Sequence, residues 1–155
     1  MVKTPFYGGY GLRAVGGIPK PAFNAFALLH QLGEQRLPLE AEGALLTRRK
    51  DGALVLALWN YADVASTVAP RRVMIEFRHV AARHVDLQSM DAQHANVMRA
   101  YESMGAPKYP TPRQIAELRQ AGALAPPARR PLKAGTLALE IPSDGLVVVT
   151  VPAPQ

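Results

Sequence analysis

The stretch that most constrains the fold is ALLTRRKDGALVLALWNYA, residues 44–62. It predicts two adjacent strands, and it predicts that one of them is buried on both faces. Asp51-Gly52 near its centre is a strong hairpin signal, since both residues tolerate the backbone angles of a tight turn. In the second strand, Leu54, Leu56 and Leu58 alternate with residues of the other face, which are mostly apolar as well. A strand that is apolar on both faces is covered on both sides, so this stretch predicts a central strand of a layered β structure.

Three further segments have the two-residue period of strands. RVMIEFRHV, residues 72–80, alternates cleanly, with Val73, Ile75 and Phe77 predicted to point inward. RHVDLQSM, residues 83–90, is a weaker strand. TLALEIPSDGLVVVTV, residues 136–151, predicts a terminal hairpin with its turn at Ser143-Asp144-Gly145.

A helix is predicted ahead of these strands in PAFNAFALLHQLG, residues 21–33. Pro21 suits the first turn of a helix, where its missing N–H costs nothing. Ala22, Phe26 and Leu29 recur at helical spacing and form an apolar stripe, which Phe23 and Ala27 widen. Gly33 is the predicted left-handed stop.

Two more helices interrupt the strands. Asp91 is the predicted N-cap of a helix in residues 91–105, which Gly105 ends. Thr111 and Gln114 predict a capping box at the start of the next helix, which Gly122 closes. The proline-rich residues 125–135 are then predicted to form a linker.

This order of elements predicts a mostly β fold: an antiparallel β-sandwich with a two-helix insertion, preceded by one helix. A chain of 155 residues fits one medium domain or a small domain with an appendage. Its apolar content of 48% and charged content of 19% are typical of a globular protein rather than a disordered one.

Composition also narrows the partners and the compartment. The chain has no cysteine, which excludes disulfides, thiolate zinc sites and cysteine nucleophiles and suits a cytoplasmic protein. The start of the sequence has no apolar signal-peptide core, and no stretch approaches the ~20 apolar residues of a membrane span. The net charge of +6 comes from scattered Lys and Arg without interleaved aromatic residues, so we expect neither a membrane nor a nucleic-acid partner.

A glycine-rich start raises the possibility of nucleotide binding. Gly9, Gly11 and Ala14 match the letters of the dinucleotide fingerprint. That site needs a strand directly before the motif and a helix that starts inside it. Only eight residues precede the motif, and Pro19 and Pro21 follow it, so the mechanism of phosphate binding is excluded.

No catalytic or metal-binding constellation emerges from the residues themselves. His79, His84 and His94 could form a three-histidine metal site, but surface histidines are the favoured interpretation because no carboxylate recurs at ligand spacing around them. The carboxylates fall in turns, helix caps and polar faces, and none of the serines lies in a nucleophile-elbow context. We therefore expect no cofactor, no metal and no catalytic residue in this chain.

Longer motifs resemble a known family. GGYGL, GIPKPAFNAFALLHQLG and LLTRRKDGALVLALWNYA follow one another in the order seen in glycoside hydrolase family 39, the β-xylosidase family. DAQHANVMRAYESMGAPKYPTPRQIAELRQAGAL is similar to the helical segment of that family, with a specific Asp-x-x-His-x-Asn start. SDGLVVVTV resembles its closing strand, so the resemblance covers about residues 6–151.

The resemblance implies that this chain is the C-terminal portion only. Family members have a (β/α)8 barrel, whose two glutamates perform a retaining hydrolysis, followed by a β-sandwich and a small helical region. Both glutamates would fall before Met1, and no position here matches either of them. Residues 1–37 then correspond to a loop and the last helix of the barrel, and residues 38–155 to an accessory sandwich with its helical insertion at about 91–124. The implied partner is an upstream barrel portion or chain.

The resemblance also suggests one candidate binding site. Phe6 and Tyr7 lie in the loop that borders the active site of the family, so they are the candidate substrate-contacting residues, through stacking on a sugar ring. A packing role is the favoured interpretation for both. Tyr7 replaces an expected histidine, Tyr101 an expected tryptophan and Ala106 an expected serine.

Two functions follow as hypotheses. In the first, the chain is the structural accessory portion of a β-xylosidase-like enzyme, in which the upstream portion hydrolyses xylo-oligosaccharides. In the second, it is a free-standing module that binds a carbohydrate, such as a xylo-oligosaccharide, or a protein. The second function needs an exposed aromatic platform, for which Trp59, Tyr61, Tyr101 and Tyr109 are available. Trp59 is expected to pack in the core, since it lies in the most apolar strand.

Overall fold

The computed structural model describes residues 4–61, 63, 66 and 68–153. The predicted hairpin around Asp51-Gly52 is confirmed, with β4 (Ala44–Arg48) antiparallel to β5 (Leu54–Asn60) and Leu46 opposite Leu56. Gly52 has a φ of 88°, and the carboxylate of Asp51 accepts a hydrogen bond from the amide of Ala53 at 2.9 Å. The turn residues therefore close the hairpin by the mechanism that their identities predict.

Six strands form the larger sheet, in the order β3-β4-β5-β10-β7-β8, and all neighbours are antiparallel. Besides β4 and β5 it contains β3 (Gln35–Leu37), β7 (His84–Met90), β8 (Ala128–Pro131) and β10 (Gly145–Val151). A smaller sheet consists of β6 (Arg71–Glu76) and β9 (Thr136–Ile141). The antiparallel sandwich predicted from the sequence is confirmed.

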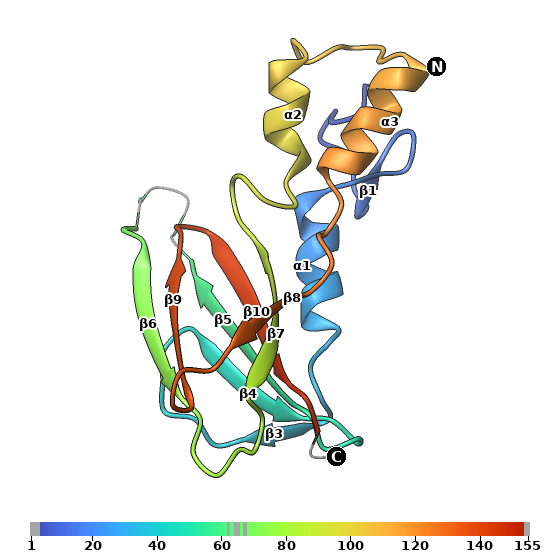
Figure 1. Cartoon of the computed structure of the whole chain (residues 1–155). Coiled ribbons are helices and arrows are strands. Elements are labelled where there is room, and N and C mark those ends of the chain that lie inside the picture. The colour runs from blue at the N-terminus through green and yellow to red at the C-terminus, as the bar shows by residue number, and fades with distance from the viewer. Residues whose placement is uncertain (1–3, 62, 64–65, 67, 154–155) are drawn as a thin grey trace.

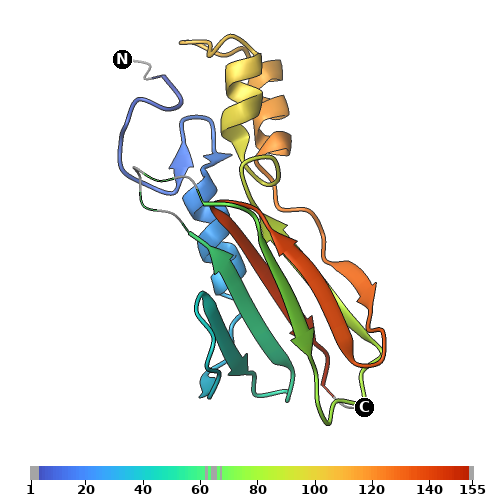
Figure 2. The ribbon, with the colours of Figure 1, turned by 90° about the vertical axis from the view of Figure 1, so that its left-hand side faces the viewer.

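The larger sheet is covered on both faces. Leu56, Leu58 and Val149 point from one face into a core that is shared with β6 and β9. From the other face, Val55, Ala57 and Val148 pack with Leu28 of helix α1 (Pro21–Leu29). Figures 1 and 2 show the resulting layers, with the small sheet on one side of the large sheet and α1 on the other. The central position predicted for β5 is therefore confirmed.

The two inserted helices lie beyond the end of the sandwich (Figure 1). They are α2 (Val97–Ser103) and α3 (Pro112–Ala121). Buried Val97 and Leu118 pack with Ala14 and Ile18 of a short N-terminal hairpin, whose strands are β1 (Arg13–Ala14) and β2 (Ile18–Pro19). The insertion therefore packs on the N-terminal segment of the chain. None of the helices in the described part of the chain is long and apolar enough to cross a membrane.

Helix ends confirm some predicted signals and overturn others. Thr111 and Gln114 form the predicted capping box of α3, and Gly105 follows α2 with a φ of 80°. Asp91 is not the N-cap of α2, because the helix begins at Val97 and Asn96 caps it. The residues between Asp91 and Asn96 form a separate loop, so the helix starts later than the first polar signal indicates.

Gly33 was predicted as the left-handed stop of α1, and this prediction is wrong. The helix ends at Leu29 with His30 as its C-cap, and Gly33 is not among the glycines with positive φ. A side chain at this position would meet the backbone carbonyl of Arg48. Gly33 is therefore needed for the close approach of the chain to the end of β4.

Residues 125–135, predicted to form a linker, contain the edge strand β8, which pairs with β7 through Val85 and Arg130. An edge strand needs hydrogen bonds on one side only, so it tolerates Pro131 and leaves its side chains exposed. The other edge strand, β3, was also not predicted. Neither segment alternates between buried and exposed residues, which is the pattern from which strands are predicted.

Candidate functional site

The predicted sugar-contacting residues lie at the start of the described chain. The ring of Phe6 packs edge-to-face on Tyr101, with ring centroids 4.8 Å apart. Phe6 also packs against the buried cluster that contains Val97 and Leu118. Tyr7 is 48% exposed, and its ring fills the space that a side chain at Gly9 would occupy. Phe6 thus has a packing partner within the chain, and contact of either residue with a sugar stays a prediction.

The histidines do not converge. His84 lies in β7, His79 lies in the loop before it and His94 lies in the loop after it. Among the described residues, no group of three or more His, Cys, Asp or Glu side chains is placed to hold a metal ion. The three-histidine metal site considered from the sequence is therefore not assembled in this part of the chain.

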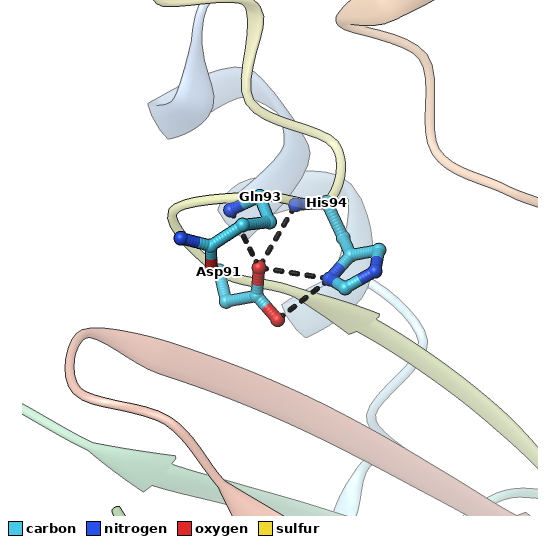
Figure 3. Close-up of polar contacts among 3 residues, drawn as sticks. All are labelled: Asp91, Gln93 and His94. Carbon is cyan, nitrogen blue, oxygen red and sulfur yellow. Dashed lines mark hydrogen bonds and ion pairs between the residues drawn. The ribbon is translucent and has the colours of Figure 1, made fainter. Parts of the chain in front are cut away.

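The most organised polar cluster is the loop at the start of the Asp-x-x-His-x-Asn motif (Figure 3). The buried carboxylate of Asp91 accepts hydrogen bonds from the backbone amides of Gln93 and His94, at 2.7 and 2.8 Å. Both of its oxygens also lie 2.9 Å from Nδ1 of His94. Burial acts to raise the pKa of Asp91, but the hydrogen bonds from His94 and from the two amides outweigh it and hold the pKa below its ordinary value.

This pair resembles part of a catalytic triad without completing one. His94 lines a cavity of about 620 Å³ between β7, β8 and β9, and Ser89 lines the same cavity. No hydrogen bond joins these two described side chains, so the contact between nucleophile and base that a triad requires is missing. The arrangement fixes the imidazole and the turn of the loop, which are structural tasks.

The rest of the motif joins three parts of the molecule. The side-chain oxygen of Asn96 accepts from the amide of Met98 and caps α2. Ala95 has a φ of 54°. Its carbonyl accepts a hydrogen bond of 2.6 Å from the side-chain amide of Asn24 in α1. The same amide group donates to the carbonyl of Gly122, also at 2.6 Å. Asn24 therefore connects α1 to the loop before α2 and to the end of α3.

The structural role of Asn24 was not predicted from the sequence. It is 1% exposed and it is the one polar side chain within the apolar run PAFNAFALL. A buried amide in such a run needs partners, which is the signal that could have drawn attention to it.

The centre of the apolar stripe predicted for α1 is exposed, at Ala22, Phe26 and Leu29, whereas Phe23 and Ala27 at its border are half-buried. The buried residues of the helix are Asn24 and Leu28, whereas Phe26 is 62% exposed and Leu29 is 37% exposed. Large apolar side chains at adjacent helical positions are exposed here while a polar one is buried. Such a patch is typical of a surface that another protein or domain covers.

The exposed patch continues into a groove of about 510 Å³ on the same side of the large sheet as α1. Its lining is mostly apolar and consists of Leu29, Leu32, Leu45, Trp59, Tyr61, Asp144, Gly145 and Leu146. Trp59 is 37% exposed, so the prediction that it packs in the core is wrong. The helix covers Val55 and Ala57, but Trp59 lies on that face outside their buried cluster. We call Phe26, Leu29, Trp59 and Tyr61 the apolar face.

Two known proteins are similar to this chain in sequence. The Beta-xylosidase of Geobacillus stearothermophilus is 34% identical over 116 residues, which are 74% of this chain and 23% of that protein. The Beta-xylosidase of Caldicellulosiruptor saccharolyticus is 29% identical over 79% of this chain and 26% of its own length. The chain therefore spans about a quarter of the length of these relatives.

Solved structures agree with the fold. The GH39 enzyme from Xanthomonas axonopodis pv. citri matches with a TM-score of 0.76 and 27% identity, over 98% of this chain and 34% of that one. A monomeric beta-xylosidase from Caulobacter crescentus CB15 matches with a TM-score of 0.84 and 15% identity, over 99% of this chain and 35% of that one, and this likeness concerns the fold alone. Residues 1–136 match the family described as Glycosyl hydrolases family 39. The chain belongs to this family.

Proposed function

We propose that this chain is the non-catalytic C-terminal portion of a β-xylosidase-like glycoside hydrolase and that its apolar face docks on the catalytic portion. The observation that supports the proposal most directly is the outward orientation of Phe26 and Leu29 on α1. In this proposal, α1 is the last helix of a barrel whose other elements lie upstream. The upstream portion supplies both glutamates of a retaining hydrolysis, and this chain supports the barrel.

The energetics favour docking over exposure. Burying a large apolar side chain stabilises an assembly by about 1.5–3 kcal/mol, so covering the four side chains of the apolar face provides a substantial driving force. The adjoining groove extends the contact onto the sheet, which would fix the orientation of the sandwich relative to the barrel. The relatives support the same interpretation, because this chain spans only 23% and 26% of their lengths.

Co-expression tests the proposal. A catalytic portion from a family member, truncated to lack the region that matches this chain, is expressed together with it, and association is measured by affinity capture. We expect association with the wild-type chain and loss of it with Phe26→Asp. Met74→Asp is the matched control, because Met74 is also highly exposed but lies on β6, on the opposite side of the sandwich. Equal capture of both variants would contradict the proposal.

Activity provides a second test. The purified chain alone should not hydrolyse an aryl β-xyloside, because the described residues contain no identified pair of catalytic carboxylates. Turnover that co-purifies with the chain through several chromatographic steps would refute the non-catalytic assignment.

A carbohydrate-binding module is the second candidate, and the exposure of Trp59 and Tyr61 in one groove favours it. Sugar recognition combines an aromatic platform with several polar groups. Apart from the aromatic residues, Asp144 is the only residue with a polar side chain in the described lining of this groove. The groove is therefore better suited to an apolar protein surface. A saturable change in Trp59 fluorescence on titration with xylo-oligosaccharides would reverse this preference.

A further inference from the structure

A second cleft, separate from the apolar face, lies where the N-terminal hairpin meets α1 and the end of α3. Figures 1 and 2 show these segments side by side at the upper end of α1. The cleft has a volume of about 450 Å³ and is lined by Arg13, Gly17, Pro19, Phe23, Asn24, Arg119, Ala123 and Leu124. It shares no lining residue with the groove beside Trp59.

Both arginines of this cleft are fixed by contacts within the chain. The guanidinium carbon of Arg13 lies 4.5 Å from the centroid of the Phe23 ring, a cation–π contact. Nε of Arg119 donates a hydrogen bond of 2.6 Å to the carbonyl of Gly16. Each contact holds a guanidinium and leaves terminal N–H groups for another acceptor. The two groups are therefore partly ordered before any ligand arrives.

Neither arginine has a carboxylate partner among the described residues. Other arginines of the chain do form ion pairs: Arg113 lies 2.9 Å from Glu117, and Arg72 lies 3.1 Å from Glu140. Among the described residues that line the cleft, only Arg13 and Arg119 are charged, and they carry the same sign. Two like charges in one concave site repel each other, and an anion between them would remove that repulsion.

We propose that this cleft binds an oxyanion, either a carboxylate or a phosphate, between the guanidinium groups of Arg13 and Arg119. Gly17, which lines the cleft, has a φ of 72°, a backbone conformation that residues with side chains rarely adopt, so no side chain covers the adjacent Arg119 guanidinium from this position. Charge-assisted hydrogen bonds from planar guanidinium groups suit both kinds of oxyanion. The site does not depend on docking at the apolar face and so extends beyond the proposed function.

Titration with inorganic phosphate and with acetate, at constant ionic strength and followed by NMR of the arginine Nε–Hε signals, tests the site on the full chain. We expect saturable shifts for Arg13 and Arg119 with millimolar affinity. Arg13→Gln and Arg119→Gln should each weaken binding by about tenfold, the effect of losing one such hydrogen bond. Arg113→Gln is the control, because Arg113 lies on the same helix as Arg119 but is already paired with Glu117.

The source of the anion is distinguished in the co-expressed assembly. If a carboxylate of the catalytic portion occupies the cleft, Arg119→Glu weakens association and phosphate competes with it. If a small free anion is the ligand, association is unchanged while the titration still saturates. Shifts that never saturate, or that are equal for Arg13, Arg119 and Arg113, would indicate general screening and overturn the proposal. If the chain does not associate with the catalytic portion, the anion titration of the chain alone should still saturate. The two proposals can therefore fail separately.

Discussion

The two sides of helix α1 differ in a way that reverses the usual pattern of a surface helix. The side that packs on the chain buries an amide, Asn24, beside Leu28, whereas the opposite side exposes Phe26 and Leu29. On the inward side, directed hydrogen bonds to Ala95 and Gly122 fix the helix to the insertion. On the outward side, apolar area remains in contact with water. The inward side therefore stabilises this chain, and the outward side is available for another surface.

The largest effect should come from Leu28→Ala. Leu28 is 0% exposed and packs between α1 and the large sheet, so its removal leaves a cavity. We expect a loss of about 2–5 kcal/mol in the free energy of unfolding, measured by urea denaturation. A loss of less than about 0.5 kcal/mol would mean that α1 does not pack on the sheet as described.

Asn24→Ala should have the next largest effect. The substitution removes two hydrogen bonds and leaves the carbonyls of Ala95 and Gly122 without this donor. The expected loss is about 2–3 kcal/mol, because buried polar groups are left unsatisfied. Hydrogen exchange should also accelerate in α2 and at the end of α3. If only α1 loses protection, then Asn24 does not join the helix to the insertion.

Asp91→Asn tests the loop before α2, to which the inward side of α1 is attached by the hydrogen bond from Asn24 to the carbonyl of Ala95. The substitution removes the negative charge that the amides and His94 stabilise, and we expect a loss of about 1 kcal/mol at pH 7. The folded-state pKa of Asp91 is lowered, so its contribution is complete above the unfolded-state pKa of about 4 and disappears as the pH falls through the lower folded value. The difference between the wild type and the variant should therefore begin to shrink below about pH 4 and close only as the pH falls through the lower folded-state pKa. A difference that persists unchanged at pH 2 would contradict this assignment.

Phe26→Ala should have the smallest effect on the stability of the isolated chain. The side chain is mostly exposed, and we expect a change within about 0.5 kcal/mol. The same substitution should markedly weaken association with a catalytic portion. A large loss of stability in the isolated chain would show instead that Phe26 packs within it, and the contrast between the two sides of α1 would be lost.

Much of the secondary structure could be predicted because its signals are local. The hairpin at Asp51-Gly52, the capping box of Thr111 and Gln114, and the alternation in β6 each depend on residues a few positions apart. The edge strands β3 and β8 gave no such signal, since their exposed residues lack alternation. The start of α2 was misplaced because Asp91 and Asn96 are both good caps, and only the loop between them decides which one caps the helix.

The candidate surfaces depended more on tertiary structure. The sequence predicted an apolar stripe containing Phe26 and Leu29, but the stripe did not reveal that the opposite side would be buried. The partner of Arg119 is a carbonyl 103 positions away, and the partners of Asn24 are 71 and 98 positions away. Local patterns cannot specify pairings over such separations.

The sequence by itself determined the strands and helices of strong period, the tight turns and the family, because these follow from local backbone preferences and from long specific motifs. Only the tertiary structure decided which side of α1 is buried, that Trp59 lies exposed beside it, and that Arg13 and Arg119 share one cleft. The physical reason is that burial and charge pairing are properties of surfaces in contact. Those contacts join residues that the chain brings together only after it has folded.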